Sequence, residues 1–254
     1  MTANTLLFDK YSEAIRAGAA PDDARLQLMA RGSLTVQYAP FEDVNPKARL
    51  VLVGITPGRV QAANALAEAR RQLEMGASAQ DAMRNAKQVG SFSGPMRTNL
   101  VALLDHIGLP KWLGVPSCEH LFDSHSDLLQ TASVLQFPVF VDGQNYNGSP
   151  EILSSALLLS QLLLYFAPLG KDLPEAVFVP LGPVPTKVML WLIKEGQFRP
   201  EQVLSGLPHP SGANAERIAY FLGRKQASQL SAKTNASVLD AARTALLTKV
   251  TQLA

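Results

Sequence analysis

The sequence predicts an α/β fold in which helices cover both faces of a parallel sheet. Short runs of Val and Leu are nearly continuous rather than alternating with polar residues, which is typical of strands buried on both faces. Segments with the helical spacing of apolar residues lie between these runs, so strands and helices alternate along the chain. Several of the helical segments begin at a proline, which suits the first turn of a helix.

Four strands and six helices are expected from these patterns. The strands are predicted at residues 49–54, 128–134, 176–181 and 202–207. The helices are predicted at residues 60–73, 95–107, 150–166, 184–194, 214–226 and 237–253. No internal repeat and no linker interrupts this order, so we expect a single domain over residues 1–254.

Composition excludes several classes of protein. Of 254 residues, 47% are hydrophobic and 17% charged, with 23 basic against 21 acidic side chains, which indicates a globular protein and not a disordered, collagenous or coiled-coil chain. No block of five or six basic residues occurs, so any nucleic-acid footprint must be local. The single cysteine, Cys118, excludes an internal disulfide, a four-cysteine zinc site and a cysteine-held iron–sulfur cluster. We expect no metal and no cofactor.

Two further features concern membranes and targeting. The N-terminus lacks an apolar stretch with a basic start, so it does not resemble a signal peptide, and a cytoplasmic location is expected. The longest apolar stretch, at residues 156–167, is about half of the ~20 residues that a membrane span needs, and it contains Ser160 and Gln161. A buried helix explains it better than a span.

The first candidate site is the loop of Gly54, Ile55, Thr56, Pro57 and Gly58, which leads from the first strand into a helix. Its glycines and proline form a tight turn whose backbone can approach a ligand, and the helix N-terminus offers N–H groups to an anion. The alternative is an ordinary strand-to-helix turn. The pattern is not that of a phosphate-binding Walker loop.

The second candidate is His209, between Pro208 and Pro210 in the loop that follows the fourth strand. Prolines on both sides restrict the backbone, so the histidine is held in a defined direction. By contrast, we expect His106, His120 and His125 to be structural or solvated.

The third candidate is Phe92, which lies between serines and glycines just before a helix. Its ring can stack on a planar ligand or fold back into the core.

Taken in order, these three loops resemble those of the uracil-DNA glycosylase superfamily, and the resemblance covers residues 46 to 225. It implies a three-layer α/β/α sandwich around a central four-stranded parallel sheet, with helical extensions at both ends of the chain. It also implies a monomeric DNA glycosylase of base excision repair, which flips a base out of DNA and hydrolyses its N-glycosidic bond.

The same resemblance assigns roles to individual residues. His209 would stabilise the departing base, Thr56 would orient the attacking water, and Phe92 would stack on the flipped base. Gly54, Ile55, Pro57 and Gly58 would line the base site. The DNA minor groove would be met by Pro210, Ser211, Gly212, Ala213 and Asn214.

Two departures from the family pattern leave alternatives open. Many members carry an acidic residue or asparagine where this chain has Thr56, which can orient a water but cannot accept its proton. A general base is typically worth ~10²–10⁴ in rate, so a base- or DNA-binding protein without turnover is one alternative, and a small-molecule nucleoside hydrolase is another. At the end of the second strand, Ser133 stands where the family has a base-reading asparagine, and Asn145 is a second source of an amide.

Overall fold

The structure is a computed structural model that describes residues 3–91 and 95–253. Its helices are α1 (Ala3–Arg16), α2 (Arg59–Glu74), α3 (Ala79–Gly90), α4 (Pro95–His106), α5 (Leu109–Leu113), α6 (Ala156–Gln161), α7 (Leu169–Asp172), α8 (Pro183–Lys194), α9 (Ala215–Phe221) and α10 (Ala236–Thr251). Its strands are β1 (Gln27–Arg31), β2 (Leu34–Gln37), β3 (Leu50–Gly54), β4 (Leu129–Ser133), β5 (Val139–Val141), β6 (Gln144–Asn145) and β7 (Val177–Pro180). None of the helices in this described part is long and apolar enough to cross a membrane.

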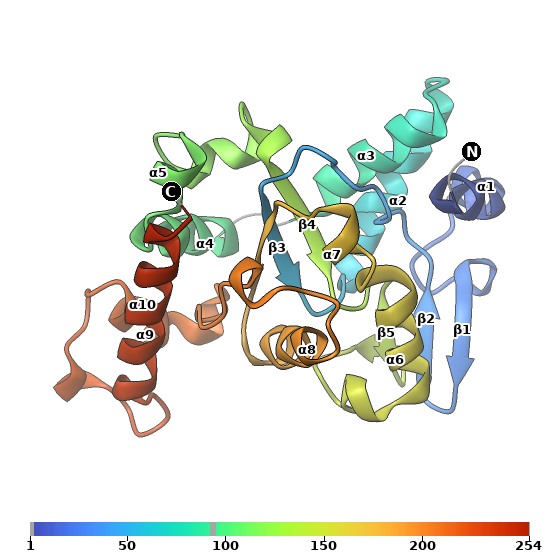
Figure 1. Cartoon of the computed structure of the whole chain (residues 1–254). Helices are drawn as coiled ribbons and strands as arrows, with labels where there is room; N and C mark the ends of the chain where they lie inside the picture. Colours follow the sequence, from blue (N-terminus) through green and yellow to red (C-terminus); the bar gives the residue numbers. More distant parts are fainter. Residues whose placement is uncertain (1–2, 92–94, 254) are drawn as a thin grey trace. The chain divides into compact units, whose positions relative to one another are not determined.

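Three strands form a parallel sheet in the order β4-β3-β7, and Figure 1 labels β3 and β4. The pairing of β3 with β7 runs from Leu50 opposite Val177 to Val53 opposite Pro180. Both strands are almost entirely buried, as their unbroken apolar sequences predict. The α/β class and three of the four expected strands are therefore confirmed.

The fourth strand, expected at residues 202–207, is reduced to a single parallel bridge between Val203 and Phe178. Next to this bridge, the Leu204 N–H donates to the Phe178 carbonyl oxygen at 2.9 Å. Gly206 has a φ of +118°, which is outside the extended region, so the chain leaves the line of a strand there. The prediction placed the segment correctly but overestimated its length as a strand.

A second sheet, which the sequence analysis did not predict, is antiparallel with the order β1-β2-β5-β6. A tight turn at Gly32–Ser33 connects β1 to β2, and a tight turn at Asp142–Gly143 connects β5 to β6. Asp142 and Gly143 have φ values of +48° and +74°, as in a type I′ turn, for which Asp-Gly is a preferred sequence. That dipeptide was the available signal for the hairpin of β5 and β6.

The helices agree with the prediction over most of the chain. Four expected helices are confirmed as α2, α4, α8 and α10. The helix expected over residues 150–166 is instead a 3₁₀ turn, then α6, then a π-helical turn at Leu162–Phe166. The helix expected over residues 214–226 ends early because Gly223, with a φ of +73°, terminates α9. α1 lies in the N-terminal stretch for which the resemblance implies a helical extension, and no expectation covered α3, α5 or α7.

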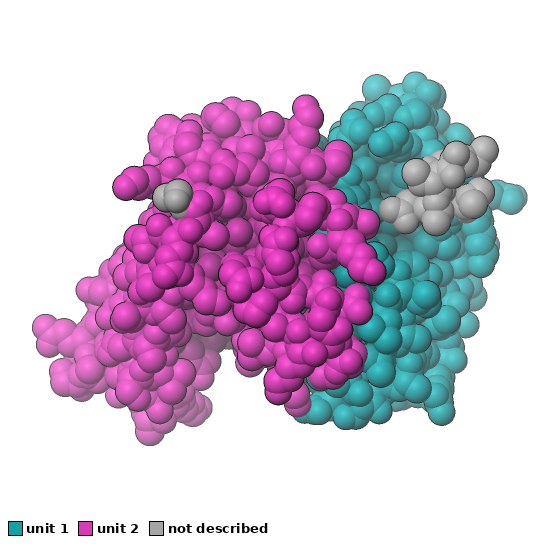
Figure 2. Space-filling view, in the orientation of Figure 1, with its two compact units in different colours: residues 1–44, 55–91, 132–169 teal, residues 45–54, 92–131, 170–254 magenta. Residues whose placement is uncertain are grey.

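The chain forms two compact units, which Figure 2 shows in different colours. Unit 1 consists of residues 1–44, 55–91 and 132–169, and unit 2 of residues 45–54, 92–131 and 170–254. Each unit is built from three separate stretches, so the chain passes between them five times. No single cut in the sequence can separate the units.

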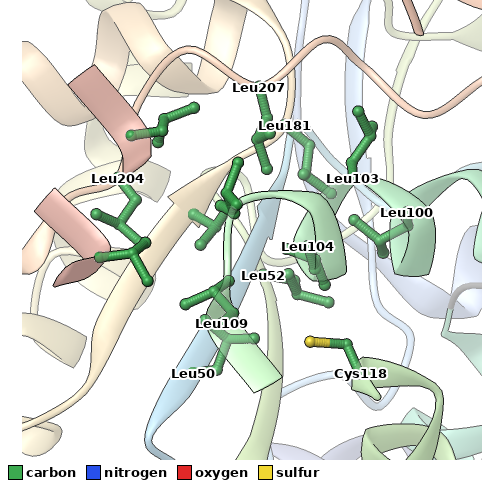
Figure 3. Close-up of a cluster of buried hydrophobic side chains, with 14 of the residues drawn as sticks. Leu50, Leu52, Leu100, Leu103, Leu104, Leu109, Cys118, Leu181, Leu204 and Leu207 are labelled. Carbon is green, nitrogen blue, oxygen red and sulfur yellow. The ribbon is translucent and has the colours of Figure 1, made fainter. Parts of the chain in front are cut away.

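The core of unit 2 is a cluster of apolar side chains, mostly leucines (Figure 3). Leu50 and Leu52 reach it from β3, and α4 adds Leu100, Leu103 and Leu104 at the spacing of one helix face. Burying each of these leucines contributes roughly 1.5–3 kcal/mol to folding. The Cys118 thiol also lies in this core, and burial raises its pKa far above the ordinary value, so it is a structural residue.

Candidate functional site

His209 lies in unit 2, in the loop that follows the Val203 bridge. The Ser211 N–H points at the Nδ1 atom of its ring at 3.2 Å. Because Nδ1 accepts this bond, the neutral imidazole carries its proton on Nε2. Burial lowers the pKa of His209 below its ordinary value, which favours that neutral form. The side chain is thus an uncharged hydrogen-bond donor at Nε2.

Two residues that the sequence analysis missed hold this histidine in place. Gly182, two residues after the end of β7, has a φ of +88°, and a Cβ added there would lie 3.2 Å from the His209 Cβ and 3.3 Å from its Cδ2. Asn99 on α4 donates from Nδ2 to the Pro210 carbonyl oxygen at 3.0 Å. The sequence signal for Gly182 was its place between the third strand and Pro183, whereas nothing in the sequence singled out Asn99.

The residues after His209 form a short 3₁₀ turn at Gly212–Asn214. The Asn214 N–H donates to the Ser211 carbonyl oxygen at 2.9 Å, and the Asn214 side chain donates to the Ser211 hydroxyl at 3.1 Å. Gly212 and Ala213 are exposed at the tip, and Pro210 is buried. Unit 2 therefore brings together His209 and the five residues that the resemblance assigns to DNA contact.

Thr56 lies in unit 1, where its hydroxyl is used by the backbone. The hydroxyl donates to the Phe137 carbonyl oxygen at 2.9 Å and accepts from the Val139 N–H at 3.2 Å. Its one proton is therefore engaged, and a single lone pair remains for a water. This geometry ties the first loop to the start of β5.

Two of the N–H groups at the start of α2, which the sequence analysis expected to be free for an anion, have side-chain partners. The Gly58 N–H donates to the Gln61 side chain at 2.9 Å, and the Arg59 N–H donates to Oδ1 of Asn145 at 2.9 Å. A Cβ at Gly58 would lie 3.6 Å from Nδ2 of Asn145. Asn145 thus caps the helix with the amide oxygen that base reading would have used, and the anion site at this helix N-terminus stays a prediction.

Other predicted site residues lie at the ends of strands. Gly54 and Ser133, the last residues of β3 and β4, are half-buried. The Ile55 carbonyl oxygen accepts from the Leu135 N–H at 2.9 Å, and Pro57 is buried. Phe92 lies outside the described residues. Nowhere in the described stretches do three or more His, Cys, Asp or Glu side chains gather closely enough to hold a metal ion.

A buried polar cluster in unit 1 also went unnoticed in the sequence. The Tyr38 hydroxyl donates to Oε1 of Glu42 at 2.5 Å, and Nζ of Lys87 donates to the Asp43 carbonyl oxygen. Burial raises the pKa of Glu42 to about 7, and burial lowers the pKa of Lys87 to about 8. Residues of this kind often mark functional sites, but no sequence motif pointed to them.

The fold and the histidine loop define the class of protein: an α/β protein that presents a neutral histidine beside a parallel sheet. No family model and no solved structure matches the chain. A curated protein, the "Uncharacterized protein YoxB" of Bacillus subtilis (strain 168), is 34% identical over 217 residues, which cover 84% of this chain and 85% of that protein. The chain therefore belongs to the same family as YoxB.

Proposed function

We propose that this chain is a DNA N-glycosylase of the uracil-DNA glycosylase superfamily, which releases a deaminated or damaged base of uracil type. The observation that carries the proposal is the state of His209, a neutral imidazole with its donor at Nε2. Such a donor suits a carbonyl oxygen of a base on which negative charge develops as the N-glycosidic bond breaks. A base buried in a duplex is out of reach, so the enzyme would first flip it out.

The chain's own residues would divide the work as follows. The Ser211 N–H and the backbone at Gly182 fix the direction of the His209 ring, so little reorganisation is needed as the base departs. The sugar becomes an oxocarbenium ion, which water attacks. The turn at Gly212–Asn214 would meet the DNA next to the vacated position.

The finer fold is part of the same proposal. A four-stranded parallel sheet within an α/β/α sandwich is supported by the bridge between Phe178 and Val203, which brings a fourth parallel segment alongside β7.

One observation favours a second function, a base- or DNA-binding protein without turnover. Thr56 would have to activate the water, yet its hydroxyl already serves Phe137 and Val139. A threonine cannot accept a proton from water at neutral pH, and the loss of a general base typically lowers a rate ~10²–10⁴-fold.

The test is base release from oligonucleotides that carry uracil, hypoxanthine, xanthine or a mismatched thymine, read out as alkali-labile abasic sites in single-turnover assays. His209→Ala is expected to lower release by about 10²–10³-fold, because an oxyanion-type donor is lost. His209→Gln keeps an N–H donor and should retain part of the activity. Free nucleosides are assayed in parallel to detect a small-molecule hydrolase.

His125→Ala is the matched control, since that half-buried histidine lies in a separate turn, where its ring contacts Ser124 and His120. Its activity should equal that of the natural protein, and all variants should keep its melting temperature within a few degrees. Full activity of His209→Ala would overturn the assignment. If the natural protein releases no base but binds DNA that carries one of these bases, the binding function replaces the catalytic one.

A further inference from the structure

The C-terminal stretch of unit 2 carries most of the chain's excess positive charge. Residues 206–254 contain six basic side chains against two acidic ones, whereas the whole chain has a formal net charge of only +2. The basic residues are Arg217, Arg224, Lys225, Lys233, Arg243 and Lys249.

Both acidic residues of this stretch are already engaged. Glu216 pairs with Lys225 at 2.8 Å and accepts from the hydroxyls of Ser231 and Thr234. Asp240 pairs with Arg243 at 2.8 Å and accepts from the Tyr220 hydroxyl. Within the described residues, Arg217, Arg224 and Lys233 form no ion pair, and all three are exposed.

Two of the basic residues, Arg224 and Arg243, lie at the C-terminal end of α9. The Arg224 N–H donates to the Ala219 carbonyl oxygen at 2.8 Å, and the Arg243 guanidinium donates to the Phe221 carbonyl oxygen at 3.2 Å. The His106 ring lies edge-on to the Phe221 ring, with 5.8 Å between their centroids. Burial lowers the pKa of His106, and repulsion from Arg243 and Arg224 lowers it further, so both guanidinium groups lie near this ring.

Two other basic residues, Arg217 and Lys233, lie at the N-terminal end of α9, next to the histidine loop. The Arg217 guanidinium donates to the Asn214 side chain at 2.7 Å and to the Lys233 carbonyl oxygen at 3.1 Å. The seven residues of α9 span about 10 Å, at 1.5 Å per residue. That length equals about three base-pair steps along the axis of a DNA duplex, at ~3.4 Å per step.

We propose that Arg217, Arg224, Lys233 and Arg243 form a phosphate-binding surface, the C-terminal basic surface, that holds the backbone of DNA beside the His209 loop. The inference rests on the proposed function, because it takes DNA as the partner of that loop. Guanidinium groups suit phosphates, to which they can donate two parallel hydrogen bonds.

The test is binding of a fluorescent, undamaged DNA duplex, measured by anisotropy between 50 and 200 mM salt. Arg224→Gln and Lys233→Gln each remove one positive charge. Neither of the two natural side chains makes a hydrogen bond to a described residue. Each substitution is expected to make the slope of log K against log salt shallower by ~0.9. The affinity of the natural protein divided by that of the variant then falls about threefold between 50 and 200 mM salt. The double variant should lose about twice that slope.

Arg31→Gln is the control, because it removes the same charge from an exposed position on β1 of unit 1. A slope like that of this control in both variants would overturn the inference and leave the proposed function standing. Loss of slope without base release from any oligonucleotide would support the surface and reject the glycosylase. Absence of DNA binding by the natural protein, or preference for an RNA duplex, would overturn the assignment of DNA.

Discussion

At the scale of single residues, Thr56 shows how one hydroxyl can serve structure where a motif suggested chemistry. Its position in a glycine-rich loop after a buried strand indicated a water-orienting role. In the structure it closes two backbone hydrogen bonds, to Phe137 and Val139. A half-buried carbonyl and N–H both need partners, so the threonine contributes to stability whether or not it contacts a water.

Replacing Thr56 by valine should therefore destabilise the protein. Valine keeps the shape but leaves the Phe137 carbonyl and the Val139 N–H without a partner, which costs about 1–3 kcal/mol. Serine keeps the hydroxyl and should cost less than about 1 kcal/mol, the value of one buried methylene. Urea denaturation of the two variants measures the difference, and equal stabilities would show that these bonds contribute nothing.

At the scale of elements, the hairpin of β5 and β6 is joined to the first turn of α2. Asn145 on β6 caps the Arg59 N–H. The Arg59 guanidinium donates to the Gly143 carbonyl oxygen at 2.7 Å and lies 4.7 Å from the centre of the Phe140 ring. Contacts between residues more than 80 positions apart in the sequence thus hold the first loop in the direction that leads into α2.

Substitution of Asn145 by alanine should lower the free energy of unfolding by about 1 kcal/mol, the usual cost of a lost helix cap. Asn145→Asp keeps the accepting oxygen and should retain most of the stability. Asn147→Ala is the matched control, since its exposed side chain makes no hydrogen bond to a described residue. Equal unfolding midpoints for the two alanine variants would contradict the capping role.

Elements with strong local patterns could be predicted from the sequence, and those held by distant partners could not. The unbroken apolar runs of β3 and β7 and the spacing of α4 carry their own signal. β1 and β6 are short and mostly exposed, and they become strands through pairing with neighbours. In the site, the prolines marked His209, while Asn99 and Glu42 are recognised only by what they contact in the folded chain.

At the scale of the whole molecule, buried ionisable groups couple stability to pH. Burial is the main cause that raises the pKa of Glu42 from its ordinary value of 4.5 to about 7 in the folded protein. The folded state therefore keeps this proton up to a higher pH than the unfolded state does. The contribution of this group to the free energy of unfolding is fully present below about pH 4.5 and is lost as the pH rises to about 7 and above.

Glu42→Gln should flatten that dependence. Between pH 4 and 8 the free energy of unfolding of the natural protein is expected to fall, relative to the variant, by up to about 3 kcal/mol, from ~1.4 kcal/mol per unit of pKa shift. Lys87, with its pKa lowered to about 8, acts in the opposite direction only above that pH. Denaturation curves measured at each pH test this, and parallel profiles for the two proteins would refute it.

The interleaving of the two units also determines when each can form during synthesis. The central strand β3 ends at Gly54, whereas its neighbour β7 begins at Val177. At ~5–20 residues per second, a ribosome needs roughly 6–25 s to make the 122 residues between these positions. Throughout that time a wholly apolar strand lacks at least one of its two neighbours. The nascent chain is therefore expected to need a holding chaperone, and expression at lower temperature with added chaperone should raise the folded yield.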